Sequence, residues 1–366
     1  MADRTHDLDL RRRLPQVLVG GLVGFVLLYV LVLAEPTPDL GGNWRTTNFG
    51  SATDDWQSFF KTLLNGLTAA GLFFIVASGF SLIFGLMRVV NMAHGSFYLV
   101  GGYIAYELQQ RMTGQGYTVL STDVNTWEWV LPALVAALSI SFVGLAVQQL
   151  FLRWNQGQEL RQALITIAIS VIIADQVIAH FNDGNAVTVT WPGWSQKLVG
   201  MPLLGFDYSL QRLLVLLFGI AVGVALWLWL YRTRTGMVIR AGVDDRPMTS
   251  ALGVNIQLTF AIAFIVGSAL AAFGGVVGAS QGTIAPGQDG QWLLNSLVVV
   301  IIGGMGSLVG AVAGSLLYGL VFAFSAVYLP TTGDNCCTQY SIVVTFVLLA
   351  LVLAFRPQGL FGRGAS

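Results

Sequence analysis

The feature that most constrains this chain is a series of apolar runs, most of them long, separated by short polar segments. A helix needs about 20 mainly apolar residues to cross the hydrocarbon core of a bilayer. Because backbone groups find no water there, such runs must form helices. Only 10% of the residues are charged, against about 25% in soluble domains. The sequence therefore predicts an all-α polytopic membrane protein.

About ten membrane segments are expected. The run at 15–34 is too long for a signal peptide and lacks a good cleavage site, so we interpret it as an uncleaved first span. The run at 293–302 is shorter than the ~17 residues of a straight span, so we expect it to be broken or re-entrant. The other expected segments are 58–86, 96–108, 130–152, 162–181, 210–231, 258–281, 308–328 and 340–355.

The positive charges predict the orientation. Of the 18 Lys and Arg residues, 13 fall on the segments assigned to one side of the membrane. Cytoplasmic loops carry this excess, so both termini of this multi-pass protein are expected inside. The layout is a tail at 1–14, an extra span with an outer polar segment at 15–57, a core at 58–356 with an inner loop at 232–256, and a tail at 357–366. Within the outer segment at 182–208, Val187 to Thr190 alternate as in a short strand pair.

A polar break at Asn91 to Gly95 interrupts the apolar sequence behind Arg88. We interpret it as a short turn at one membrane face. The small residues after it, such as Ser96, let helices approach closely in lipid. His94 beside Asn91 is interpreted either as lining a pore or as making a hydrogen bond that stabilises the turn.

A similar pattern recurs in the second half of the chain. The short apolar run at 293–302 is followed by a break at Gly303 to Ser307, which includes Gly304 and Gly306. Short apolar segments interrupted by glycine in matching places of two halves indicate a transport site. The alternative is that both breaks are tight turns between packed helices. On the first interpretation Asn91, His94, Ser96, Gly303, Gly304, Gly306 and Ser307 are candidates for the translocation path.

Asp175 is the one carboxylate well inside an apolar run. Acidic groups within the membrane are costly and usually functional, so Asp175 is a further path candidate. Gln176 and His180 share a helix face beside it. The alternative is a structural pair with a neighbouring helix.

The inner loop at 232–256 carries signals for a short helix near 247–252. Asp244 or Asp245 can cap its start, and Pro247 suits its first turn. Gly253 suits the left-handed residue after its end. A capped helix between two spans is a natural contact for a cytoplasmic partner, and the alternative is a solvated loop.

Several of these pieces together resemble the Liv-type permeases, the membrane subunits of branched-chain amino-acid ABC importers, and the LivH branch in particular. They are the segments 90–95, 65–79, 251–253 and 302–310, and the resemblance covers about 59–356. It implies a permease of the type II, vitamin-B12-importer-like class in the bacterial inner membrane, working with a second permease, two ATPase subunits and an extracytoplasmic binding protein. It also implies that 240–255 is the ATPase-coupling segment, with Asp244, Asp245, Pro247, Ala251, Leu252 and Gly253 as its candidate contacts. The extension through 54 departs from the family.

Other kinds of site are not indicated. No phosphate-binding loop is present, so any ATP hydrolysis must occur on separate subunits, and no cofactor is expected. The histidines His6, His94 and His180 lack metal-ligand spacing. A formal net charge of zero, without a basic patch, argues against nucleic-acid binding. Cys336 and Cys337 are adjacent and pair only with strain, and no role is assigned to them.

Alternatives remain at the level of function. Urea permeases and related carboxylate importers share the motif pattern, so an importer of the same class for urea or a small carboxylate is the alternative. A secondary carrier or channel would need more ionisable groups at depth, and a membrane enzyme would need a catalytic cluster. The sequence leaves open the substrate, homodimer or heterodimer assembly, whether 293–302 crosses, and the role of the extension.

Overall fold

The computed structural model describes residues 37–38, 44–45, 56–114, 124–181, 186–202, 205–328 and 337–361. The expected first span at 15–34 and the tail at 1–14 lie outside these residues, as does Cys336.

The described part of the chain is mainly helical, which confirms the all-α prediction. The hairpin strands are β1 (Thr37–Pro38) with β2 (Trp44–Arg45), and β3 (Leu198–Met201) with β4 (Phe206–Ser209). The helices are α3 (Trp56–Met87), α4 (His94–Thr113), α5 (Thr126–Val147), α6 (Glu159–His180), α7 (Leu210–Arg232), α8 (Arg234–Asp244), α9 (Arg246–Ala251), α10 (Ile256–Gln281), α11 (Asp289–Gly303), α12 (Leu308–Tyr328) and α13 (Cys337–Phe355).

Six helices of the described residues are long and apolar enough to cross a membrane. They are α3, α5 with its continuation to Asn155, α6, α7, α10 and α12. The 15-residue α11 is about 22 Å long, short of the ~30 Å hydrocarbon core. The chain is therefore a multi-pass membrane protein in which α11 cannot span alone, as its short apolar run predicts.

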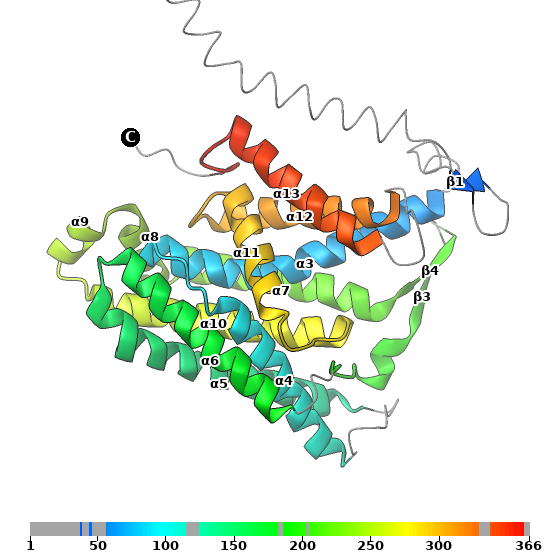
Figure 1. The fold of residues 1–366 in the computed structure, drawn as a ribbon, viewed down its shortest axis with the longest axis horizontal. Coiled ribbons are helices and arrows are strands. Elements are labelled where there is room, and N and C mark those ends of the chain that lie inside the picture. Colours follow the sequence, from blue (N-terminus) through cyan, green and yellow to red (C-terminus); the bar gives the residue numbers. More distant parts are fainter. Residues whose placement is uncertain are drawn as a thin grey trace, which may run out of the picture.

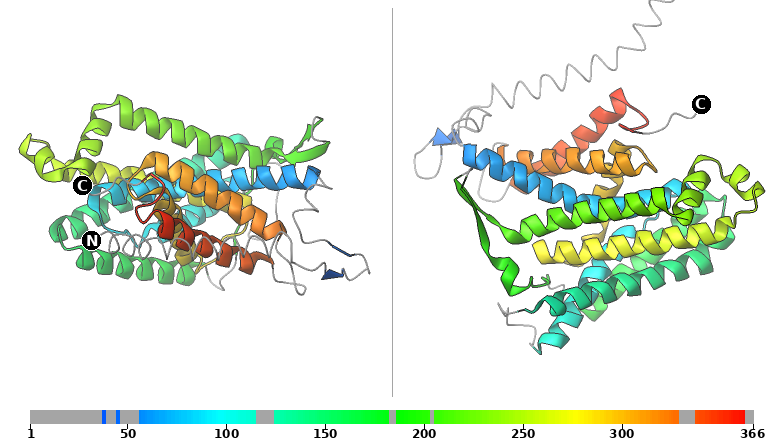
Figure 2. Two further views of the ribbon diagram at one scale, coloured as in Figure 1. Left: turned by 90° about the horizontal axis from the view of Figure 1, so that it is seen from above. Right: turned by 180° about the vertical axis from the view of Figure 1, so that it is seen from behind.

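The helices lie side by side, with α8 and α9 at one end and the β3–β4 hairpin at the other (Figure 1). We call these the α9 end and the strand end. Figure 2 shows the same separation of the two ends from behind. α11 runs across the direction of the other helices, between the layer of α12 and α13 and the layer of α4 and α10.

α3 occupies the centre of the molecule, with Ile75, Val76 and Ala77 fully buried. Its glycines allow this position, because they let other helices approach its backbone. Gly71 faces the backbone of α7, and Gly79 faces Gly267 of α10. In lipid the hydrophobic effect does not drive helices together, so helix association depends on close van der Waals packing, which small residues allow.

The start of α4 lies inside the bundle, which corrects the expected turn at a membrane face. The His94 ring lies 3.0 Å from the carbonyl oxygen of Val76. Val76 precedes the end of α3 at Met87 by 87 − 76 = 11 residues, or about 16 Å of helix. The segment after Arg88, whose φ is +53°, therefore turns back into the protein before α4 begins.

Two loop predictions are also corrected. The segment Val187 to Thr190 is not a strand pair: Val187 forms an isolated bridge with Ile284, while the paired strands are β3 and β4. The inner loop at 232–256 is more helical than expected, because α8 precedes the short helix α9. Gly236 lies against the backbone at the end of α7, so α8 folds back on α7 instead of entering solvent.

Candidate translocation site and coupling surface

The polar centre of the molecule joins three helices at the start of α4. The Ser96 hydroxyl donates to Oδ2 of Asp289 at 3.1 Å and lies 2.7 Å from the hydroxyl of Ser170. Since Ser96 uses its proton on the carboxylate, Ser170 is the donor to Ser96. One turn earlier on α6, Thr166 accepts a hydrogen bond from the backbone N–H of Met92. We call Ser96, Ser170, Thr166, Asp289, Asn91 and His94 the polar cluster.

Glycine makes this meeting possible. A Cβ on Gly95 would collide with the carbonyl oxygen of Asp289. The first turn of α4 therefore rests directly against the first turn of α11. Both helices begin here, so the unpaired N–H groups and the partial positive charge of two helix N-termini come together near the Asp289 carboxylate.

Two buried nitrogens of the polar cluster have no partner among the described residues. They are Nδ2 of Asn91 and Nδ1 of His94, in side chains that are 3% and 0% exposed. Buried polar atoms are normally satisfied, so these donors or acceptors fit a water or a polar group of a passing solute. Asn91 also caps its own turn, since its Oδ1 accepts from the N–H of Ala93.

Sequence reasoning missed Asp289 and Ser170. Asp289 stands before the apolar run of α11 and behind Pro286 and Gly287, where the sequence pattern indicates a loop residue and not an intramembrane acid. The segment at 282–288, which is bridged to Val187 through Ile284, brings Asp289 against Gly95 and Ser96 at the start of α4. One sequence signal could have identified Asp289. The apolar run at 293–302 is too short to span the membrane, so the polar residues before it are expected to enter the protein as well.

The structure places the other path candidates away from the polar cluster. Asp175 is exposed on α6 and forms no hydrogen bond or ion pair with the described residues. Gly303 to Ser307 form a tight turn between α11 and α12, at the opposite end of α11 from Asp289. Gly304 and Gly306 have φ of +106° and +80°, and the Ser307 hydroxyl caps α12 through the N–H of Gly310.

The predicted coupling helix is α9, displaced by one residue from 247–252. The Asp245 side chain accepts from the N–H of Met248 at 3.0 Å, so Asp245 is the cap, and Pro247 occupies the first turn. Gly253, which follows the C-cap residue Leu252, has φ of +83°. The side chains of Met248 and Leu252 are 59% and 74% exposed. α9 therefore presents apolar side chains outward at one end of the molecule, with Ala251 exposed beside them.

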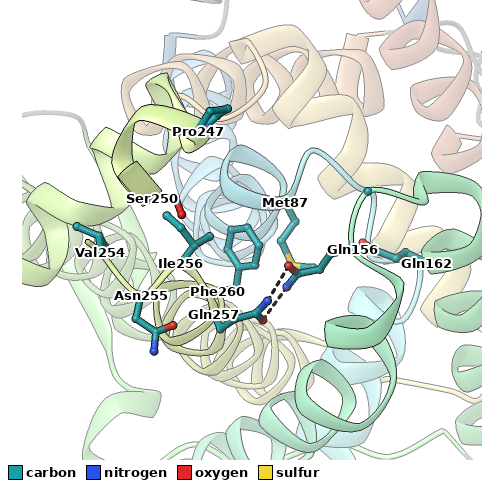
Figure 3. A pocket seen from close by; sticks show the side chains of 11 residues that line it. Met87, Gln156, Gln162, Pro247, Ser250, Val254, Asn255, Ile256, Gln257 and Phe260 are labelled. Atoms are coloured by element: carbon teal, nitrogen blue, oxygen red, sulfur yellow. Dashed lines mark hydrogen bonds between the residues drawn. The ribbon is translucent and has the colours of Figure 1, made fainter. Parts of the chain in front are cut away.

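A pocket of about 600 Å³ lies beside α9, between the end of α3, the turn before α6 and the start of α10. Figure 3 shows Pro247 and Ser250 on one side and the facing amides of Gln156 and Gln257 on the other. These two side chains exchange two hydrogen bonds, each 2.8 Å long. We call them the amide pair. It ties the first turn of α10 to the loop that leads into α6.

Comparison with known proteins places the chain in a family. Residues 62–353 match the family model described as branched-chain amino acid transport system / permease component. The chain is 30% identical over 309 residues to the high-affinity branched-chain amino acid transport system permease protein BraD of Pseudomonas aeruginosa, covering 83% of this chain and 96% of that protein. It is 28% identical over 315 residues to LivH of Escherichia coli, covering 85% and 98%.

A probable LivH of Methanocaldococcus jannaschii is 24% identical over 305 residues, covering 82% of this chain and 92% of that protein. Among solved structures, PsaBC from Streptococcus pneumoniae in complex with Fab is 11% identical with a TM-score of 0.49, covering 86% of this chain and 98% of that one, a similarity too low to inform on function. Because the family model and these relatives cover most of its length, the chain belongs to the family of permease components of branched-chain amino acid transport systems.

Proposed function

We propose that this chain is the transmembrane permease subunit of an ATP-binding cassette importer for branched-chain or other hydrophobic amino acids. The observation that carries the proposal is the polar cluster, where the N-termini of α4 and α11 meet inside a membrane bundle around Asp289 and Ser96. Interrupted helices whose N-termini converge within the membrane are a common design of transport sites.

The proposal includes a second permease of this family, two cytoplasmic ATPase subunits and an extracytoplasmic binding protein. The chain has no phosphate-binding loop, so ATP hydrolysis on the separate subunits must act by contact. We place the α9 end in the cytoplasm, because arginines lie at the ends of the helices there, such as Arg88, Arg153 and Arg232.

The contacts of the described residues support a route from α9 to the polar cluster. A displacement of α9 is transmitted to the first turn of α10, because only the short segment 252–255 separates the two helices. The amide pair passes the movement to the loop before α6. α6 carries Thr166 and Ser170, which bond to the start of α4. Movement of α6 therefore alters the polar cluster.

The test is uptake of radiolabelled L-leucine by cells that express the importer with or without this chain. Loss of ATP-dependent uptake without the chain, and its return with the wild-type gene, is the expected result. Unchanged uptake without the chain would overturn the function.

Asp289→Asn tests the site separately. It keeps an oxygen acceptor for Ser96 but removes the charge, and we expect uptake to fall about tenfold with unchanged membrane levels, the scale of one charge-assisted hydrogen bond. Asp207→Asn, an exposed carboxylate on β4, is the matched control. Normal uptake in Asp289→Asn would remove Asp289 from the path and leave the function standing.

A further inference from the structure

A second cavity, of about 290 Å³, lies between α4, α5 and α6 at the strand end. Its apolar wall consists of the aliphatic residues Val100, Ile104, Leu108, Val135 and Val177 and the aromatic residues Tyr103 and Phe181. Ligand sites usually measure about 300–1,000 Å³, so a cavity near the lower limit suits a molecule of amino-acid size.

The rim of this cavity carries charges of both signs. Glu107 and Arg111 form an ion pair along α4, with Oε1 of Glu107 2.9 Å from Nη2 of Arg111. Their side chains are 24% and 73% exposed. His180 adds another polar group at the edge of the cavity. Exposed ion pairs of this kind contribute little to stability, so a ligand that offers each partner an opposite charge can separate them at low cost.

The cavity lies on the same helix seam as the polar cluster. On α4, Ser96, Val100, Glu107 and Arg111 recur at helical spacing along one side, and Ser96 contacts Ser170 of α6. On α6, Val177 lies two turns beyond Ser170. α6 buries only Gln162, Thr166 and Val177 against the rest of the described chain. Only partly buried residues such as Ile169 and Ile173 add to this packing, so few buried contacts hold the seam closed.

We propose that this cavity is an entry site for the zwitterion of an aliphatic amino acid. Arg111 binds the carboxylate, Glu107 binds the ammonium group, and the aliphatic wall receives the side chain. The site rests on the proposed function, which it deepens: the amino acid released at the strand end pauses here before it passes along the α4–α6 seam to the polar cluster.

A zwitterion with apolar parts could also come from the lipid, as the headgroup of phosphatidylethanolamine. The size of the cavity favours the free amino acid, as does its position on α4, where its lining begins at Val100, one helical turn after Ser96 of the polar cluster. The experiment uses both sources, with the full chain in nanodiscs of phosphatidylcholine and phosphatidylglycerol, and no binding protein present.

Binding of radiolabelled L-leucine is measured in competition with 3-methylbutylamine, which lacks the carboxylate, and with 4-methylpentanoate, which lacks the ammonium group. The wild-type chain should bind leucine saturably and prefer it to each analogue by about tenfold or more, the scale of one charge-assisted hydrogen bond. Arg111→Gln should lose the preference over the amine and keep the preference over the acid. Glu107→Gln should show the reverse.

Because each variant keeps one preference, misfolding cannot imitate the expected pattern. Lys197→Gln and Asp207→Asn, which remove exposed charges near and on the β3–β4 hairpin, should bind like the wild type. Absent leucine binding in the wild type, unchanged preferences in both variants, or displacement of leucine by added phosphatidylethanolamine would each overturn the entry site. If cellular leucine uptake nevertheless depends on the chain, the proposed function survives this result.

Discussion

At the scale of single residues, the closest approach in the proposed site depends on Gly95. Adding a Cβ there drives α4 away from the carbonyl of Asp289. We expect Gly95→Ala to lower the free energy of unfolding by about 1–3 kcal/mol, the cost of overpacking, and to reduce uptake because Ser96 and Asp289 separate. Gly290→Ala is the matched control: it lies in the first turn of α11, and nothing stands within 4 Å of its added Cβ. A wild-type thermal midpoint and uptake in Gly95→Ala would show that this contact is not required.

Within the described part of the single chain, no contact explains why α6 carries a carboxylate at Asp175. It is exposed on a helix that the membrane or another subunit must cover. A lipid-facing carboxylate is costly, so we expect Asp175 to face the second permease or the path. Asp175→Leu should therefore impair leucine uptake while the protein still reaches the membrane. If Asp175→Leu transports normally in the same assay, Asp175 faces neither.

At the scale of secondary-structure elements, α9 presents the exposed apolar side chain of Met248 to a partner, with Leu252 exposed directly after it. A Val at Gly253 would carry a β-branched side chain at φ +83°, which costs about 1–2 kcal/mol and misplaces the end of α9. Ala251→Glu would add bulk and charge to the exposed surface. We expect both variants to release the ATPase subunits or to uncouple ATP hydrolysis from uptake. Gly282→Val, at an extended φ of −163° with open space, is the control. Wild-type transport and ATPase co-purification in both variants would place the contact elsewhere.

The amide pair connects elements that are 101 residues apart in the chain. Replacing one partner, as in Gln156→Leu or Gln257→Leu, leaves the other amide without its two hydrogen bonds. We expect each single variant to lower uptake per ATP hydrolysed, and the double variant to be less impaired than their effects added together. Gln158→Leu, exposed in the same loop, controls for the loss of a polar side chain. Additive effects would mean that the two amides act independently.

At the scale of the whole molecule, the prediction concerns which end faces the cytoplasm. In a chain with Cys336→Ser and Cys337→Ser, single cysteines replace Ser250 on α9 and Lys197 beside β3, both exposed. A membrane-impermeant maleimide added outside intact cells should label Lys197→Cys and not Ser250→Cys, and the pattern should reverse in inverted vesicles. Labelling of Ser250→Cys from outside would invert the proposed orientation.

The sequence by itself determined the membrane class, most helix limits and the position of α9. These rest on local properties: apolar length sets the spans, while the cap at Asp245, Pro247 and the positive φ at Gly253 define α9 to within one residue. Only the tertiary structure decided that α4 begins inside the bundle and that Ser96 meets Ser170 and Asp289, 74 and 193 residues away. No local pattern encodes such contacts, because they depend on how Gly95 lets two helix N-termini approach. In the tertiary structure Gly303 to Ser307 form a turn between α11 and α12, and Asp175 lies on an exposed face of α6. Neither residue set joins the polar cluster, because packing and not composition decides which polar groups share a site.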